Sequence, residues 1–425
     1  MRLILTGADV YMRGGFSKSN IAIENGRIIS LSPTVTSSDG DIVKDVTGYS
    51  IFPGFTDVHV HFREPGFFYK ETIKTGSMAA ARGGYTTVCT MPNLNPCPDC
   101  AENLKIQTEA IDRDAVIRIV PYGTITKGEN GQELSDMEDM APCVAGFSDD
   151  GRGVQKEDMM RLAMNKAKSL NKPIVAHCED NTLLFGGYIH AGKYAKEHNH
   201  RGICSESEWK QIERDIALAE ETGCQYHVCH ISTKESVDLI RYAKARGVKI
   251  TCETAPHYLV LDENDLREEG RFKMNPPLRS TDDRLALIEG LKDGTIDCIA
   301  TDHAPHSAEE KSRGLEKSLM GVVGLETAFS VLYTKLVKNN VVPLERIIDA
   351  ITARPNEIFG FDGGEIKEGS RADLAVFDLN KCYKIDSSEF LSQGKSTPFE
   401  GFDVFGRNMM TIADGRIVWQ ERERR

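Results

Sequence analysis

Two histidines in the segment 57–61 have the residue type and spacing of metal ligands. In an extended strand, residues i and i+2 point to the same side, so His59 and His61 can converge on one cation. Neutral imidazole is a natural ligand of zinc. An isolated pair of this kind is as often two histidines on one strand face, so the interpretation depends on what other residues the chain supplies.

A second pair with the same spacing, His198 and His200, serves as an internal comparison. These histidines lie in a polar stretch without an apolar strand beneath them. We therefore expect them to lie in a solvated loop and not to bind a metal.

Further His and Asp residues stand at the ends of apolar runs. Together with the first pair, five predicted strand ends carry such side chains: His59 and His61, Asp150, His177, His230 and Asp302. Barrel enzymes build their active sites from the C-terminal ends of several strands. Imidazoles and carboxylates without thiolates suit a catalytic zinc site with an open position for water. We therefore predict one or two zinc ions per subunit as the cofactor.

The middle of the chain contains the elements that would position these residues. Apolar runs that predict strands lie at 50–58, 86–91, 116–121, 144–148, 173–177, 225–231, 248–253 and 296–301. Most of the gaps hold an amphipathic helical pattern, such as 207–221. Strands that alternate with helices are typical of a parallel sheet, and eight such units fit a closed (β/α)8 TIM barrel. An open doubly wound sheet is the alternative, but it usually has a Gly-rich loop after its first strand, where this chain has the histidine pair.

The two ends of the chain have a different pattern from the middle. Short alternating strands around Gly and Asn turns fill residues 1–50 and 363–425. We therefore expect an α/β fold in which 1–50 and 363–425 are the N-terminal and C-terminal parts of one small β-sandwich. Residues 51–362 are expected to form the metal-dependent barrel.

Composition excludes several classes of protein. The 425 residues carry a formal net charge of −12, which offers no basic surface for nucleic acid or an anionic membrane. No run approaches the roughly 20 apolar residues of a membrane helix. The eleven cysteines lie mostly in apolar runs, which indicates a reducing, cytoplasmic location. Cys97 and Cys100 form a lone CxxC in a Pro-rich loop, and we expect two free thiols there.

Two longer segments connect the chain to a known family. Residues 57–66 and 300–311 resemble the two signature segments of dihydroorotases. The linking segments 147–154, 176–180, 229–232 and 274–279 resemble those of the same family, and the similarity covers essentially the whole chain. It is greatest to the long bacterial class. Hydantoinases and allantoinases share the His-x-His barrel, so the segment 300–311 carries more weight for the substrate than the first motif.

The resemblance implies roles for the metal-ligand candidates. His59, His61 and Asp302 would hold one zinc, His177 and His230 a second, and Asp150 would bridge the two. Many members of the wider superfamily bridge their metals with a carboxylated lysine, but no lysine lies between Val144 and Gln155. Asp149 is the adjacent alternative to Asp150, which is preferred by motif resemblance alone.

Substrate contacts follow from the same segments. Arg63 lies two residues beyond His61, on the same side of an extended chain, where a guanidinium can bind a carboxylate through two parallel hydrogen bonds. The resemblance implies that Asn93 and His306 also contact this carboxylate, that Asn275 contacts the ring amide, and that the backbone of Met320 and Gly321 closes over the ring. The family usually has an aromatic residue where Met320 stands. The loop 303–323 is expected to act as a lid.

The implied activity is that of a dihydroorotase, the zinc-dependent reversible hydrolysis of dihydroorotate to N-carbamoyl-aspartate in pyrimidine biosynthesis, with Asp302 carrying the proton. One alternative is a hydantoinase or allantoinase, whose rings lack a carboxylate to match Arg63. The other is a catalytically silent scaffold subunit for aspartate carbamoyltransferase, which should have lost metal ligands, whereas every expected position is filled here. The sequence leaves open whether the chain forms a homodimer or a complex with aspartate carbamoyltransferase. It predicts neither nucleic acid nor a membrane as a partner.

Overall fold

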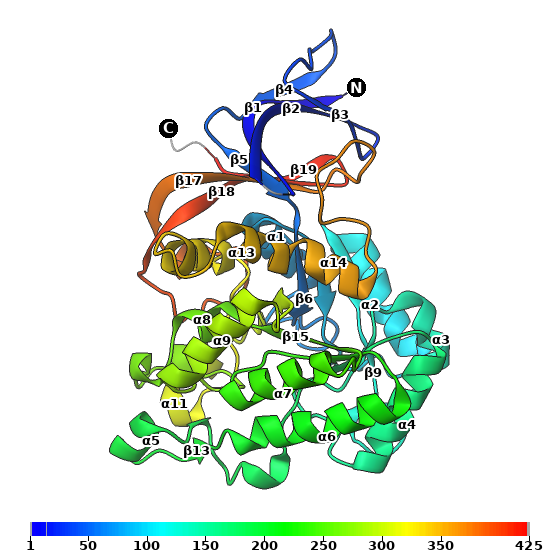
Figure 1. The fold of residues 1–425 in the computed structure, drawn as a ribbon, viewed down its shortest axis with the longest axis vertical. Helices are drawn as coiled ribbons and strands as arrows, with labels where there is room; N and C mark the ends of the chain where they lie inside the picture. Colours follow the sequence, from blue (N-terminus) through cyan, green and yellow to red (C-terminus); the bar gives the residue numbers. More distant parts are fainter. Residues whose placement is uncertain (1, 14, 423–425) are drawn as a thin grey trace.

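A barrel with helices around it carries a curved sheet built from both ends of the chain (Figure 1). The structure is a computed structural model that describes residues 2–13 and 15–422. Met1, Gly14 and 423–425 fall within the expected terminal segments and lie outside the described residues.

Parallel strands form the wall of the barrel. Within the described residues there are eight, namely β6 (Phe55–Val60), β7 (Tyr85–Thr90), β8 (Arg118–Pro121) with its continuation β9 (Gly123–Thr124), β10 (Phe147–Ser148), β11 (Ile174–Ala176), β14 (Tyr226–Val228), β15 (Ile250–Thr254) and β16 (Cys298–Ile299). Val60 forms a parallel bridge to His303, which follows β16, and so closes the barrel. The predicted TIM barrel is confirmed.

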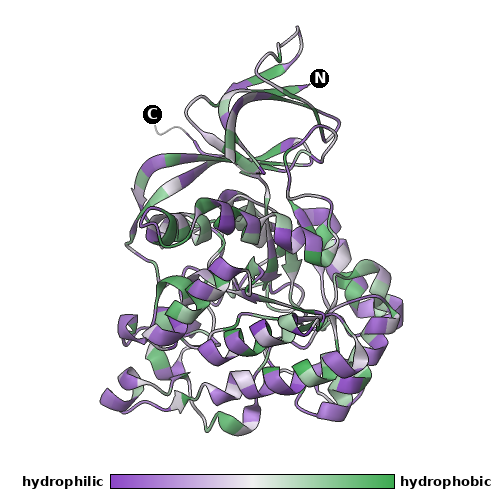
Figure 2. Ribbon diagram, in the orientation of Figure 1, coloured by the Kyte–Doolittle hydropathy of each residue, from purple (hydrophilic) through white to green (hydrophobic). Residues whose placement is uncertain are grey.

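Helices surround the strands. The longer ones are α1 (Ile73–Gly83), α2 (Ala101–Asp114), α4 (Glu157–Ser169), α6 (Glu206–Thr222), α7 (Lys234–Ala245), α9 (Thr281–Asp293), α13 (Leu344–Ile351) and α14 (Ala353–Phe359). The predicted helix 207–221 is α6, which buries Ile212, Ile216 and Ala219 on one face, at the spacing of an amphipathic helix. Figure 2 shows the mixture of hydrophilic and hydrophobic residues along these helices.

Shorter elements lie in the connections. They are α3 (Met137–Met140), α5 (Lys193–Glu197), α8 (Pro256–Val260), α10 (Ala308–Lys311), α11 (Gly314–Lys317), α12 (Ala328–Leu332) and the two-residue strands β12 (Ile189–His190) and β13 (Gly202–Ile203). Of these, α10 and α11 belong to the loop 303–323. No helix in the described part of the chain is long and apolar enough to cross a membrane.

The terminal sheet combines strands from both ends of the chain. Its order is β19-β18-β17-β5-β1-β2-β3, and β4 pairs with β1. The strands are β1 (Leu3–Met12), β2 (Gly15–Glu24), β3 (Arg27–Ser32), β4 (Ile42–Asp45), β5 (Ser50–Pro53), β17 (Leu374–Lys384), β18 (Asp403–Ala413) and β19 (Arg416–Gln420). Leu5, Ile51 and Leu374 belong to the core that this sheet encloses. The expected β-sandwich from both termini is therefore present.

The run 50–58, expected as one strand, is divided between two sheets. Residues 50–53 form β5, which pairs with β1 and with β17, whereas β6 starts the barrel at Phe55. Gly54 lies between them, and a Cβ atom at this position would be 2.2 Å from Oγ1 of Thr86. Only glycine allows so close an approach where the chain changes sheets. The pairing of the terminal sheet thus extends three residues past the expected limit of 50.

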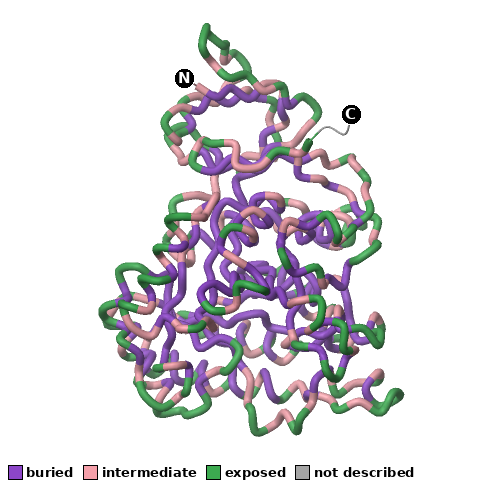
Figure 3. The backbone as a smooth tube through the Cα atoms, turned by 180° about the vertical axis from the view of Figure 1, so that it is seen from behind, coloured by how far each residue is buried: buried purple, intermediate pink, exposed green. Residues whose placement is uncertain are grey.

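Burial follows this architecture. All residues of β6 and β7 are buried, and the exposed segments lie mainly in the outer helices and loops (Figure 3). Strands covered by helices are apolar along their whole length, so His59 and Asp57 within buried β6 are exceptions that need an explanation.

Candidate metal centre and active site

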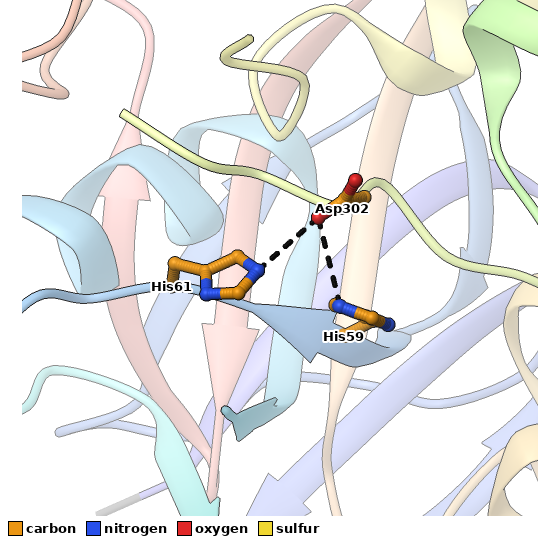
Figure 4. Close-up of side chains that lie close together, drawn as sticks. All are labelled: His59, His61 and Asp302. Atoms are coloured by element: carbon orange, nitrogen blue, oxygen red, sulfur yellow. Dashed lines mark hydrogen bonds and ion pairs between the residues drawn. The ribbon is translucent and has the colours of Figure 1, made fainter. Parts of the chain in front are cut away.

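His59, His61 and Asp302 meet where strands β6 and β16 end (Figure 4). The Oδ1 atom of Asp302 lies 3.2 Å from Nε2 of His61 and 3.6 Å from Nε2 of His59. All three side chains are buried. The i, i+2 spacing thus brings both imidazoles to one carboxylate that is more than 240 residues away in the chain.

Asp150 lies between this group and two further histidines. Its Oδ1 atom is 3.4 Å from Nε2 of His59, 3.6 Å from Nε2 of His230 and 3.7 Å from Nδ1 of His177. Its Oδ2 atom is 3.5 Å from Nε2 of His61. The structure therefore brings together all six side chains that the sequence analysis named as metal-ligand candidates.

Asp149 has a different environment from its neighbour. Its carboxylate accepts hydrogen bonds from the backbone N–H groups of Ile125 at 2.8 Å and Thr126 at 3.1 Å, and from the Thr126 hydroxyl. These bonds connect two barrel strand ends. Asp150, and not Asp149, is therefore the carboxylate that faces the histidines.

The donor set fits a divalent cation. Among the described residues, Nε2 of His59 and Oδ1 of Asp150 are buried without a hydrogen-bond partner. Buried polar atoms are normally satisfied, so such atoms that face one another call for a ligand. The groups His59–His61–Asp302 and His59–Asp150–His230 each bring three ligand atoms within 4.8 Å of one another. Nitrogen and oxygen donors of this kind suit zinc.

Electrostatics keep both carboxylates charged. Burial by itself would raise the pKa of Asp302, but the hydrogen bond with His61 and the nearby His59 outweigh it and lower the pKa to about 2. Burial likewise opposes ionisation of Asp150, whose pKa nevertheless lies well below its ordinary value because of His59 and His230. Two buried carboxylates attract a cation.

Backbone conformation also distinguishes this region. Arg63, His230 and Asp302 have φ angles of 58°, 32° and 49°. Residues other than glycine seldom adopt the left-handed region, and such strain concentrates at functional sites.

A cavity of about 220 Å³ lies next to the cluster. It is lined by His61, Arg63, Asn93, Asp150, Gly151, His177, His230, Asn275, Asp302, Ala304, His306, Met320 and Gly321. Each expected substrate contact lies on this wall. His59, which is completely buried, is the one metal-ligand candidate that does not line the cavity.

Arg63 supplies a positive charge to the cavity wall. Its side chain is buried, and its Nε donates a hydrogen bond to the carbonyl of Pro305 at 3.3 Å. Burial lowers the pKa of the guanidinium to about 10, so it stays charged at neutral pH. Within the described part of the chain no carboxylate forms an ion pair with it. Asp150 and Asp302 on the same wall face the histidines and not Arg63, and a buried guanidinium without an ion-pair partner favours an anionic ligand.

Asn93 and His306 are both engaged by the protein. The Oδ1 atom of Asn93 lies 2.9 Å from Nδ1 of His61, which leaves the amide nitrogen of Asn93 for another acceptor. In His306, Nε2 is 2.7 Å from the carbonyl of Met320, and Nδ1 is 3.2 Å from Nζ of Lys70. Both ring nitrogens of His306 therefore have protein partners in this arrangement, and a direct bond to a carboxylate would have to displace one of them.

Gly321 allows the loop 303–323 to approach the site closely. A Cβ atom there would lie 2.7 Å from the carbonyl oxygen of Ala304, and the φ angle is 133°. Lys311, which is buried, donates hydrogen bonds to the carbonyls of Gly321, Leu319 and Lys273 at 2.7, 2.8 and 2.9 Å. These bonds hold Met320 and Gly321 at the cavity wall.

Sequence reasoning missed Glu253 as a site residue. This buried carboxylate on β15 has its Oε1 atom 2.6 Å from Nδ1 of His59. The available signal was a carboxylate at the last position of the predicted strand 248–253, where the chain has Glu instead of the His or Asp present at the other strand ends. His257 lies in α8, and burial lowers its pKa to about 4.

The second histidine pair and the CxxC cysteines lie outside the metal-ligand cluster. His198 is exposed, and His200 pairs with Glu268 at 2.7 Å on the connection after α5. Cys97 and Cys100 are free thiols, as expected.

The sequence of the chain is similar to those of known enzymes along almost its whole length. A family model described as "Dihydro-orotase-like" matches residues 48–236. The chain is 50% identical over 422 residues to a dihydroorotase of Fusobacterium nucleatum, with 99% of each chain covered. It is 47% identical over 421 residues to a dihydroorotase of Bacillus cereus strain B4264, covering 99% of this chain and 98% of that one.

Solved structures show the same architecture. An L-hydantoinase (dihydropyrimidinase) from Arthrobacter aurescens superposes with a TM-score of 0.87 at 25% identity, covering 99% of this chain and 96% of that one. A D-hydantoinase (dihydropyrimidinase) from Thermus sp. superposes with a TM-score of 0.85 at 26% identity, covering 99% of this chain and 97% of that one. Barrel, sandwich and buried cluster together make this chain an amidohydrolase, an enzyme that hydrolyses cyclic amides. With nearly half of its residues identical to those relatives along almost its whole length, it belongs to the dihydroorotase family.

Proposed function

We propose that this chain catalyses the reversible hydrolysis of dihydroorotate to N-carbamoyl-aspartate, a step of pyrimidine biosynthesis, with zinc as its cofactor. One observation favours dihydroorotate over the uncharged rings hydantoin and dihydrouracil as the substrate. Arg63 places a buried guanidinium, which among the described residues forms no ion pair with a carboxylate, at the wall of the cavity that adjoins the metal-ligand cluster. Dihydroorotate carries the anion that this position favours, whereas hydantoin and dihydrouracil do not.

The side chains that we propose as metal ligands are the ones that lie close together in the structure. His59, His61 and Asp302 would hold one zinc, His177 and His230 a second, and Asp150 lies between both sets. When bound, zinc lowers the pKa of water toward about 7 and polarises a carbonyl oxygen. The proposal of one or two ions per subunit rests on the unsatisfied buried atoms of His59 and Asp150.

The protein side chains have separate tasks in this proposal. Arg63 and the amide nitrogen of Asn93 bind the substrate carboxylate and so orient the ring. Asp302 accepts the proton of the attacking water and returns it to the leaving amide nitrogen, as a general base and then a general acid. Asn275 contacts the ring amide, and Met320 and Gly321 cover the ring. His306, which also lines the cavity, contacts the substrate carboxylate once one of its two protein partners is displaced. In the reverse direction, N-carbamoyl-aspartate loses water and closes to the ring.

Location and assembly are further parts of the proposal. The eleven cysteines are all free thiols, which supports a reducing, cytoplasmic environment. A homodimer and a complex with aspartate carbamoyltransferase are proposed from the sequence resemblance. Light scattering of the purified chain, alone and mixed with that enzyme, tests both. A purely scaffolding role is disfavoured because all six expected ligand positions are filled and face one another.

The experiment that tests the function combines metal analysis with turnover. We expect zinc in the purified protein and hydrolysis of dihydroorotate far in excess of hydantoin hydrolysis. The double variant His59→Ala with His61→Ala should lose both zinc and activity. Active protein without zinc would overturn the cofactor, and equal turnover of both rings would overturn the substrate.

A further inference from the structure

Glu179 connects the metal-ligand cluster to the opposite wall of the cavity. Its Oε2 atom accepts a hydrogen bond from Nδ2 of Asn275 at 3.1 Å and lies 3.6 Å from Nε2 of His177. Its side chain is 14% exposed. Glu179 follows β11, and Asn275 lies between α8 and α9, 96 residues further along the chain.

The chemistry of the two groups dictates how the amide of Asn275 is turned. An amide has a donor end and an acceptor end, whereas an ionised carboxylate only accepts. The nitrogen of Asn275 must therefore face Glu179, and the oxygen must face the other way. Among the described residues, Oδ1 of Asn275 is buried and has no hydrogen-bond partner. Because Asn275 lines the cavity, this unsatisfied acceptor indicates a donor on the ligand.

The loop that carries Glu179 is itself held in place. The backbone carbonyl of Glu179 accepts a hydrogen bond from Nε2 of Gln155 at 3.0 Å. Oε1 of the same glutamine accepts one from the N–H of Asn181 at 3.0 Å. Gln155 thus binds the chain on both sides of Asp180. A carboxylate on a fixed backbone can impose one orientation on a neighbouring amide.

We propose that Glu179 is a positioning residue that turns the oxygen of Asn275 toward the substrate and thereby selects a ring N–H at this position. The inference rests on the proposed function and deepens it. Without the Glu179 carboxylate, the side-chain amide of Asn275 can rotate and present its NH₂ group to the cavity. That group and the ring N–H are both donors, so no hydrogen bond can form between them. A site built to hydrogen-bond a substrate N–H discriminates strongly against a ligand that cannot make the bond.

A swap of the two side chains tests this directly. Glu179→Gln removes the charge and allows either amide orientation, and we expect kcat/KM to fall about 10- to 100-fold, mainly through KM. Asn275→Asp places two carboxylates in contact and should lower kcat/KM by at least as much.

In the double variant Glu179→Gln with Asn275→Asp, the new glutamine donates to the new aspartate, whose second oxygen again offers an acceptor to the cavity. The double variant should therefore bind substrate better than either single variant.

Two further measurements separate positioning from other roles. Affinity for orotate, an unreactive ring with the same carboxylate, should follow the same order, and zinc content should be equal in all four proteins. The matched control Glu268→Gln alters an exposed carboxylate that binds His200 and Tyr194, and should behave as the wild type.

The results distinguish this inference from the function on which it rests. A double variant that is no better than the single variants overturns the positioning role, and so does loss of zinc in Glu179→Gln, which would make Glu179 a support for His177. Wild-type protein that binds orotate but does not hydrolyse dihydroorotate would overturn the proposed function. The order of orotate affinities would then still decide the role of Glu179.

Discussion

Nδ1 of His59 lies 2.6 Å from Oε1 of Glu253, and neither side chain is accessible to solvent. The other oxygen of Glu253 is 3.2 Å from Nε2 of His227, so the carboxylate lies between two imidazoles. When Nδ1 of His59 donates its proton to Glu253, Nε2 keeps its lone pair and faces Asp150 and Asp302. This is the tautomer that a metal ligand requires.

Glu253→Gln should weaken zinc binding about 10- to 100-fold, because carboxylates that orient a ligating histidine contribute at this level. Competition with a chromophoric chelator measures the affinity. Glu289→Gln, at an exposed carboxylate that pairs with Lys292, is the control and should leave the affinity unchanged. Unaltered zinc affinity in Glu253→Gln would show that His59 keeps its orientation without the carboxylate.

Asp302→Asn should retain zinc but lose turnover about 100- to 10,000-fold, the usual cost of removing a general acid or base. Asparagine has nearly the same shape but cannot accept the proton. Steady-state kinetics together with metal analysis provide the test. Turnover within a few-fold of the wild type would exclude Asp302 as the proton carrier.

Arg63→Met should abolish most hydrolysis of dihydroorotate, because the substrate carboxylate would enter a buried site without its cation. Loss of one member of a buried pair costs roughly 3 to 5 kcal/mol. Dihydrouracil, the same ring without the carboxylate, should be a poor substrate for the wild type and should be unaffected by the substitution. If wild type hydrolyses both rings equally well and Arg63→Met changes neither rate, the substrate assignment is wrong.

Lys311→Met should loosen the loop 303–323, since the substitution removes three hydrogen bonds to backbone carbonyls. We expect faster proteolytic cleavage within this loop and a higher KM, because Met320 and Gly321 lose their anchor. Lys317→Met, at an exposed position of the same loop, is the matched control. Identical cleavage rates for the two variants would contradict the anchoring role of Lys311.

His190→Gln should make the protein less sensitive to acid. Burial, together with the adjacent charge of Arg279, lowers the pKa of His190 to about 4. Between pH 6.5 and 4 the unfolded chain therefore takes up a proton at this histidine and the folded protein does not, so the stability present above pH 6.5 is lost as the pH falls. Urea unfolding at pH 7 and pH 5 should show a smaller decrease for the variant. Equal decreases would mean that His190 is protonated in the folded state.

Local patterns in the sequence determined most of the architecture and the metal-ligand candidates. Strand and helix periodicity is a property of neighbouring residues, so the alternation in the middle of the chain predicted the barrel. The convergence of His59 and His61 follows from the geometry of a single strand. Asp150, His177, His230 and Asp302 were found because the carboxyl ends of barrel strands lie at one face, whatever the distance between them in the chain.

The tertiary structure decided which side chain meets which. Asp149 and Asp150 are adjacent in sequence but have different partners. Asp149 binds Thr126 at the neighbouring strand end, whereas Asp150 faces the histidines. Glu253 is 194 residues from His59, and Glu179 is 96 residues from Asn275. Such contacts depend on how whole strands and loops are placed around the barrel, and no periodicity or spacing within one segment encodes that placement.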